Sequence, residues 1–568
     1  MSTERITRGF AWNHLYKMVE YGGVSLYSIL VVRKFGPEIG GSYAVYLSIT
    51  GTLAILSAFA VDGVLLRYLP RLSRGELQIG EAKIEGVRPF LLQLFAFRLL
   101  VTAAISALVV LVLAVLPMFV PSLGVSLGSI AKLWPYFVVF LFGQAGVAFG
   151  TFTMIGLLQV RWVFFASLVA RLSLLGVGLA LILMSALTLE NAVGLHALAA
   201  VLNACLLLYW VNRHVHKESS QGLRKEAIEF AKHLAGFVRK PGYLRVFIVM
   251  PFMLYGITTW GSDVLSTVLG RQPDILMMRA ILGENAPDIG LYESAARLVL
   301  MTEYVFLFGL GGTLISVFSE LAHQDETAPT PGNGKSEAGG KASPPLPSAS
   351  RYPKLLAARK EIAGFQSVST APLFAFMLMF APLVIHVLYG YRFAAATPIV
   401  VAGLSILSMT VILFGGGMQV TSLVVIGKER AVFANRLTWG LLNLVANYFL
   451  IKSYGGLGAM IGTQVANAGA CMVESYLAKK WIGPSFSLVR SARILIIVGI
   501  AAIITYSGVN LLPSTTPLLL RLLIGGFGMA TLTGAGYILF KVPEAKKVFD
   551  RLLGLLRPRG LQPVTESK

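Results

Sequence analysis

Residues 99–120 read LLVTAAISALVVLVLAVLPMFV, a run without a single charged side chain. A helix needs about 20 predominantly apolar residues to cross the hydrocarbon core of a bilayer. A strand of a membrane β-barrel instead alternates apolar and polar residues over about 10 positions, and this run does not alternate. The stretch therefore predicts a membrane-spanning α-helix.

The same pattern recurs along the whole chain. Its 568 residues are 56% hydrophobic and only 13% charged, whereas soluble domains carry about 25% charged residues. We therefore predict an all-α integral membrane protein with about 14 transmembrane helices. The apolar segments are 11–32, 43–66, 89–116, 134–157, 163–185, 192–212, 246–270 (or to 282), 290–318, 361–388, 397–424, 431–451, 456–477, 494–512 and 517–540.

The formal charge of +21 comes from 48 lysines and arginines against 27 acidic residues. Nucleic-acid binding would require a basic patch on a soluble face. Instead, most of these cations fall in the N-terminus, the even-to-odd connections and the C-terminal tail. The positive-inside rule then places both termini in the cytoplasm, where the basic segments would also attract the anionic lipids of the inner leaflet. We expect no nucleic-acid partner.

Two short patterns repeat at nearly the same offset. Pro37 and Gly40 recur as Pro287 and Gly290, and Gly194, Asn203 and Ala204 recur as Gly458, Asn467 and Ala468. Each lies at a corresponding place in two six-helix halves, which predicts two parallel repeats related by an axis along the membrane normal. The predicted parts are an N-terminal half (1–212), a basic amphipathic connector (213–245), a C-terminal half (246–480) with a disordered cytoplasmic loop (324–351), helices 13 and 14 (481–540) and a basic cytoplasmic tail (541–568).

Ionisable side chains inside the predicted helices are candidates for function, because each costs about 2.5–3.5 kcal/mol at helix depth on the insertion scale. Asn13, Lys17 and Glu20 share one face of the first helix. The candidates for substrate binding are Lys17, Glu20, Arg98, Arg171, Asp263, Arg271, Arg279 and Arg297. Those for ion coupling are Glu20, Asp263 and Glu303.

Structural alternatives stay open for several candidates. Arg98 and Arg171 lie near the cytoplasmic ends of their helices, where a long side chain can reach the headgroups. Arg271, like Arg279, could lie at the outer edge of helix 7. Glu293 and Arg297 are four residues apart and could pair with each other for structural reasons alone.

Catalytic and metal-binding motifs are not found in the sequence. The seven histidines are scattered, and His214 and His216 would point to different sides of a helix, which disfavours a zinc site. The short odd-to-even loops leave little room for an active site outside the bilayer. We expect no metal, no cofactor and no enzymatic activity.

Four motifs carry a family resemblance: residues 31–38 (VVRKFGPE), Asp62-Gly63, residues 388–393 (LYGYRF) and residues 427–430 (GKER). Together they resemble the Wzx-like polysaccharide flippases, the polysaccharide transporter family of the multidrug/oligosaccharidyl-lipid/polysaccharide exporter superfamily. The resemblance extends over nearly the whole chain.

The resemblance implies a multi-pass protein of the bacterial cytoplasmic (inner) membrane that moves an undecaprenyl-diphosphate-linked oligosaccharide to the outer leaflet. Transport would proceed by alternating access and serve the biosynthesis of surface polysaccharide or lipopolysaccharide. Implied partners are the polyprenyl-diphosphate-linked glycan, membrane lipids and a polysaccharide polymerase or other envelope assembly proteins. Two alternatives stay open: a cation-coupled multidrug exporter of the same fold, and a non-transporting membrane scaffold for envelope enzymes.

Overall fold

The computed structural model describes residues 3–72, 86–119, 128–157, 159–215, 228, 230–236, 247, 251–268, 270–283, 286–306, 310–326 and 352–546. In these ranges the ordered elements are α-helices with short 3₁₀ and π turns and no strand, which confirms the all-α class. Nine of the described helices are long and apolar enough to cross a membrane. The chain is therefore a multi-pass membrane protein, whereas the count of fourteen spans and the cytoplasmic termini stay predictions.

The chain divides into two compact units. Unit 1 comprises Met1–Thr313, Leu388–Gly403 and Gly427–Ala470, and unit 2 comprises Leu314–Val387, Leu404–Ile426 and Cys471–Lys568. The predicted repeat layout remains a prediction. Most of the predicted connector, the loop from residue 327 onward and the tail from residue 547 lie outside the described residues.

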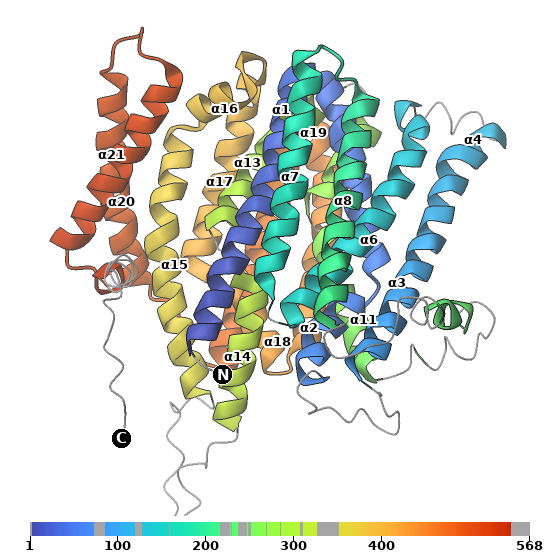
Figure 1. Ribbon diagram of the computed structural model, residues 1–568. Coiled ribbons are helices and arrows are strands. Elements are labelled where there is room, and N and C mark those ends of the chain that lie inside the picture. The colour runs from blue at the N-terminus through green and yellow to red at the C-terminus, as the bar shows by residue number, and fades with distance from the viewer. Residues whose placement is uncertain are drawn as a thin grey trace, which may run out of the picture. The chain divides into compact units, whose positions relative to one another are not determined.

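Unit 1 holds the helices that carry every candidate site residue. Inside it α1 packs on both α7 and α13, and α6 packs on α8 (Figure 1). Its elements are α1 (Thr3–Ala58), α2 (Val61–Leu72), α3 (Val87–Val110), α4 (Leu116–Phe119), α6 (Trp134–Gly156), α7 (Val160–Leu183), α8 (Leu189–Val215), α11 (Pro251–Val268), α12 (Arg271–Leu282), α13 (Pro287–Phe306) and most of α19 (Glu429–Trp481).

Two predicted connections between helices are sharp turns at a glycine. Within α1 the helix is broken at Gly36, where φ is 84°, so the first predicted segment lies before this break, and the second lies after it and runs on into α2. Segments 431–451 and 456–477 are likewise the two helical parts of α19 on either side of Gly455, where φ is 56°. Glycine adopts positive φ without steric cost, so the chain bends there without forming an open loop.

The repeated turns found in the sequence lie against each other in the fold. A Cβ atom at position 290 would lie 2.1 Å from the carbonyl oxygen of Pro37, so only a glycine fits there. Small residues at helix interfaces allow this kind of close backbone approach in membrane proteins. Gly290 thus permits the close crossing of α13 over α1 seen in this conformation, and this crossing brings the polar residues of α13 toward α1.

Unit 2 contains α15 (Pro353–Met379), α18 (Met418–Val425), α20 (Leu488–Asn510), α21 (Leu518–Leu539) and most of α14 (Leu310–Glu326). Both α20 and α21 pack on α15 (Figure 1). Two further helices belong partly to each unit, α16 (Ala381–Tyr389) and α17 (Thr397–Met409).

The end of α14 is fastened to the start of α15. Asp325 accepts hydrogen bonds from the backbone N–H groups of Lys354 (3.2 Å) and Leu355 (3.1 Å), which have no partner within their own helix. Because α14 continues through Glu326, the first three residues of the predicted loop 324–351 are helical. That part of the loop prediction was wrong.

Candidate functional site

The polar face of α1 meets α7 at Arg171. A Cβ atom at Gly23 would lie 2.7 Å from the Cβ of Arg171, so this glycine lets the two helices approach closely. Arg171 forms an ion pair with Glu20, and its Nε donates a second bond to Glu20 Oε2 at 3.3 Å. Arg171 is only 6% exposed, so it binds within the protein instead of reaching toward the headgroups.

Lys17 lies one turn before Glu20 on the same helix. Its ammonium lies 5.1 Å from the ring centroid of Tyr16 and 5.2 Å from that of Tyr21. The faces of aromatic rings attract cations. Two tyrosines therefore stabilise a positive charge next to the Glu20–Arg171 pair.

Arg98 of α3 binds Asp62 of α2. The Arg98 residue is 1% exposed and the Asp62 side chain 21% exposed. Nε of Arg98 has no hydrogen-bond partner in the part of the chain that the structure describes. Asp62 was noticed in the sequence only within the family motif, and its role as the partner of Arg98 was not predicted.

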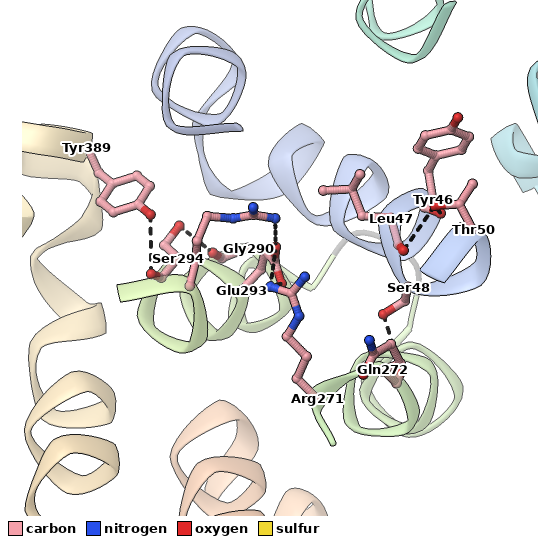
Figure 2. Close-up of polar contacts among 11 residues, drawn as sticks. Tyr46, Leu47, Ser48, Thr50, Arg271, Gln272, Gly290, Glu293, Ser294 and Tyr389 are labelled. Atoms are coloured by element: carbon pink, nitrogen blue, oxygen red, sulfur yellow. Dashed lines mark hydrogen bonds and ion pairs between the residues drawn. The ribbon is translucent and has the colours of Figure 1, made fainter. Parts of the chain in front are cut away.

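A three-residue ion cluster joins α12 to α13. Nη1 of Arg271 lies 3.0 Å from Oε1 and 3.2 Å from Oε2 of Glu293 (Figure 2). Arg297 binds the same carboxylate. The Glu293 side chain is 1% exposed, Arg297 6% and Arg271 21%. The predicted contact between Glu293 and Arg297 is confirmed, but it is shared with Arg271. One carboxylate faces two guanidinium groups, so the cluster carries a net positive charge.

Hydrogen bonds from neighbouring elements hold this cluster in place. The hydroxyl of Tyr389 donates to the carbonyl oxygen of Ser294 at 3.3 Å, and Ser48 of α1 donates to the carbonyl oxygen of Gln272 at 3.3 Å. Figure 2 shows both contacts on either side of Arg271 and Glu293. The start of α12 and the middle of α13 are thus tied to α1 and to Tyr389.

A second polar network surrounds Asp274, which is fully buried. Its carboxylate accepts hydrogen bonds from Tyr292, from Asn447 Nδ2 at 2.7 Å and from Thr463 Oγ1 at 2.7 Å. Asn443 donates to Thr463 at 3.2 Å. Carboxylate and amide oxygens are also the ligands that hard cations such as Ca²⁺ prefer. Among the described residues no group of three or more His, Cys, Asp or Glu side chains could hold a metal ion.

Three further candidates lie outside these clusters. Asp263 on α11 is exposed, and Glu303 on α13 and Arg279 on α12 are half-buried. Asp263 lies within electrostatic range of Arg436 and Asp62, and Glu303 within range of Arg436. The structure thus brings Arg271 and Arg297 together at one carboxylate but leaves Arg279 outside that cluster.

Comparison with known proteins yields matches among solved structures alone. No family model and no curated protein sequence matches the chain. The lipid II flippase MurJ in an inward closed conformation is 13% identical, with a TM-score of 0.61, 93% of this chain covered and 99% of that one. The chain has the fold of this flippase. An inward-facing MATE family multidrug transporter of the MOP superfamily is 14% identical, with a TM-score of 0.52, covering 82% of this chain and 94% of that one.

A third similar structure is a MOP superfamily transporter from Pyrococcus furiosus, whose binding pocket is described as having reverse polarity. It is 15% identical, with a TM-score of 0.54, covering 84% of this chain and 95% of that one. Lipid flippase and multidrug transporter thus share one fold with this chain. A shared fold does not determine function, so the function must be argued from the chain's own residues.

Proposed function

We propose that the protein is a flippase that moves an undecaprenyl-diphosphate-linked oligosaccharide from the cytoplasmic to the outer leaflet by alternating access. The observation that carries the proposal is the cluster of Arg271, Glu293 and Arg297, in which two guanidinium groups share one carboxylate. Guanidinium groups bind phosphate oxygens with paired, charge-assisted hydrogen bonds. The 21% exposed Arg271 would meet the diphosphate first, with Arg297 behind it.

The charge balance at α1 supports the same cargo. Glu20 is neutralised by Arg171, which leaves the charge of Lys17 in excess beside the pair. A diphosphate diester carries two negative charges at neutral pH and cannot enter an apolar medium without partners. The excess of one cation at each of the two clusters matches that requirement, whereas a cationic drug would be repelled by both.

An apolar groove between α20 and α21 supports a lipid-linked cargo. It has a volume of about 580 Å³, which is large enough for part of a prenyl chain. The residues that line it include Ile497, Ile500, Ile504, Leu532, Ile538 and Leu539. Helices 13 and 14 of the predicted scheme, which are α20 and α21, would then contact the hydrocarbon tail.

A cation-coupled multidrug exporter is the second candidate, and the buried carboxylate of Asp274 favours it. Of the predicted coupling residues, Glu20 is engaged by Arg171, which leaves Asp263 and Glu303 for that role. A scaffold without transport activity remains the third. Neither alternative accounts for the surplus of buried cations beside Glu293.

Flipping by the purified protein in liposomes tests the proposal. The liposomes would contain a fluorescent undecaprenyl-diphosphate disaccharide, and an enzyme outside would report the sugar that reaches the outer leaflet. A charge-assisted contact contributes about 1.5–3 kcal/mol, so Arg271→Gln should weaken apparent affinity about 10- to 100-fold. Arg521→Gln is the matched control, because Arg521 donates to the carbonyl oxygens of Leu512 and Pro513 and belongs to none of the ion clusters described above.

The control variant should transport like the unaltered protein. If the unaltered protein moves no lipid-linked sugar but expels a lipophilic cation down an ion gradient, the exporter alternative is correct. If the folded protein does neither, the result favours the scaffold alternative.

A further inference from the structure

Several buried polar atoms of unit 1 have no hydrogen-bond partner among the described residues. Four of them are near neighbours: Tyr43 Oη, Tyr46 Oη, His196 Nδ1 and Arg297 Nε. The two tyrosines are 0% exposed, Arg297 5% and His196 6%. Most buried polar groups in proteins are hydrogen-bonded, and a buried polar group that lacks a partner destabilises the fold. We call these four atoms the unpaired set.

The unpaired set lies in one region of the protein interior. The stacked rings of Tyr43 and Tyr46 have centroids 6.4 Å apart, and the Tyr46 ring lies 6.3 Å from the imidazole of His196. Arg297 is within electrostatic range of both Tyr43 and His196. Figure 2 shows the Tyr46 ring extending away from the contact between Ser48 and Gln272. Helices α1, α8 and α13 thus carry a row of neighbouring polar groups that begins at Arg297 and Tyr43 and continues to Tyr46 and His196.

Four other buried tyrosines among the described residues are paired. Tyr27, only 1% exposed on the same helix α1, donates to the carbonyl oxygen of Ala192 at 2.9 Å. Tyr292, Tyr389 and Tyr537 also donate to protein oxygens. The fold therefore satisfies tyrosine hydroxyls elsewhere and leaves those of Tyr43 and Tyr46 available for another partner.

We propose that the unpaired set binds the hydroxyl groups of the sugar attached directly to the diphosphate. This inference rests on the proposed function and adds a sugar subsite to it. A sugar hydroxyl both donates and accepts, so it can pair with a tyrosine hydroxyl, an imidazole nitrogen or the N–H of a guanidinium. Because Arg297 also belongs to the cationic cluster, a diphosphate bound there would place its first sugar next to the unpaired set. The sugar reaches these atoms in a conformation in which α1, α8 and α13 separate, as alternating access requires.

The first part of the experiment measures stability without ligand. Tyr43→Phe and Tyr46→Phe each remove a hydroxyl that has no protein partner, so the midpoint of thermal unfolding in detergent should stay the same or rise. Tyr27→Phe is the matched control, because it removes the bond to Ala192 and should lower that midpoint. A clear decrease for both Tyr43→Phe and Tyr46→Phe would show a structural role and overturn the proposal.

The second part measures binding of two probes to the same proteins. One is farnesyl diphosphate joined to N-acetylglucosamine, and the other is the same farnesyl diphosphate esterified with methanol. The unaltered protein should bind the sugar-bearing probe more tightly. Tyr43→Phe and Tyr46→Phe should each lose about three- to tenfold in affinity for that probe, the effect of one neutral hydrogen bond, and keep their affinity for the methyl ester. Tyr27→Phe should retain the preference for sugar.

The outcomes separate the inference from the function on which it rests. If the unaltered protein binds both probes equally, or if the phenylalanine variants keep the full preference for sugar, the sugar subsite is wrong and the diphosphate site stands. Internal water would then be the partner of these hydroxyls. If the unaltered protein binds neither probe, the proposed function fails and the subsite fails with it.

Discussion

Replacing Glu293 by glutamine tests how the ion cluster is built. The carboxylate binds Arg271 and Arg297 together, and the Glu293 side chain is 1% exposed. Glu293→Gln keeps the shape of the side chain but removes the carboxylate that two neighbouring guanidinium groups share. Removing one partner of a buried ion pair costs about 3–5 kcal/mol, because the other charge is left uncompensated. We expect a loss of at least this size, since two charges lose their partner.

The two arginine variants should cost less. Arg271→Gln leaves the contact between Glu293 and Arg297, and Arg297→Gln leaves the two bonds from Arg271 at 3.0 and 3.2 Å. Each therefore retains one ion pair, and Arg271→Gln should be the mildest because Arg271 is the most exposed of the three. In a chain of this size, 1 kcal/mol corresponds to no more than about 2–4 °C in the unfolding midpoint. Glu293→Gln should thus lower the midpoint by a few degrees, about 3–5 °C.

A double variant provides the sharpest form of this measurement. Glu293→Gln combined with Arg297→Gln leaves one guanidinium instead of two, so it should be more stable than Glu293→Gln alone. The difference between the double variant and the sum of the single variants measures the coupling of the pair. Unfolding of the protein in detergent, followed by tryptophan fluorescence, supplies the midpoints. If Glu293→Gln is as stable as the unaltered protein, or if the single effects simply add, the three residues do not act as one cluster.

The remaining predictions concern the loop and the topology. Asp325→Ala removes the cap of α15 and should lower the free energy of unfolding by about 1 kcal/mol. Replacing residues 327–351 by a short Gly-Ser linker should leave stability and transport nearly unchanged, because Asp325 already holds the two helix ends together. Complete loss of transport by the deletion variant at normal protein levels would mean that the loop binds a partner. Reporter fusions after residues 230, 340 and 560 should all show a cytoplasmic location, and a periplasmic signal at 340 would refute the predicted two-half topology.

Contacts between residues close in the sequence could be predicted, whereas contacts between residues far apart in the sequence could not. The apolar run 99–120 was sufficient for the all-α class, and the spacing of Glu293 and Arg297 was sufficient for their contact, because residues four apart share one helix face. By contrast, Arg171 and Glu20 are 151 positions apart, and only the close crossing at Gly23 brings them together. An isolated sequence carries no information on such crossings.

The Asp274 network shows the same limit in another form. Asn443 and Asn447, four residues apart in an otherwise apolar stretch of α19, were a visible signal of a polar helix face. Thr463 gave no signal, since a lone threonine in a membrane helix usually bonds to its own backbone. Its bond to Asp274 depends on the kink at Gly455, which folds the second half of α19 back past Asn447.

The placement of the buried charges supports the anionic cargo that we propose. Stability alone would favour equal numbers of cations and carboxylates in the interior, because each uncompensated charge at membrane depth is costly. Arg98 follows that rule, with Asp62 as its partner. The Glu293 cluster does not, because Arg271 and Arg297 share one carboxylate, and Lys17 stands against tyrosine rings beside a pair that is already neutral. A ligand with two negative charges would remove both surpluses, and the unpaired hydroxyls of Tyr43 and Tyr46 beside Arg297 add the neutral donors and acceptors that a sugar on the diphosphate requires.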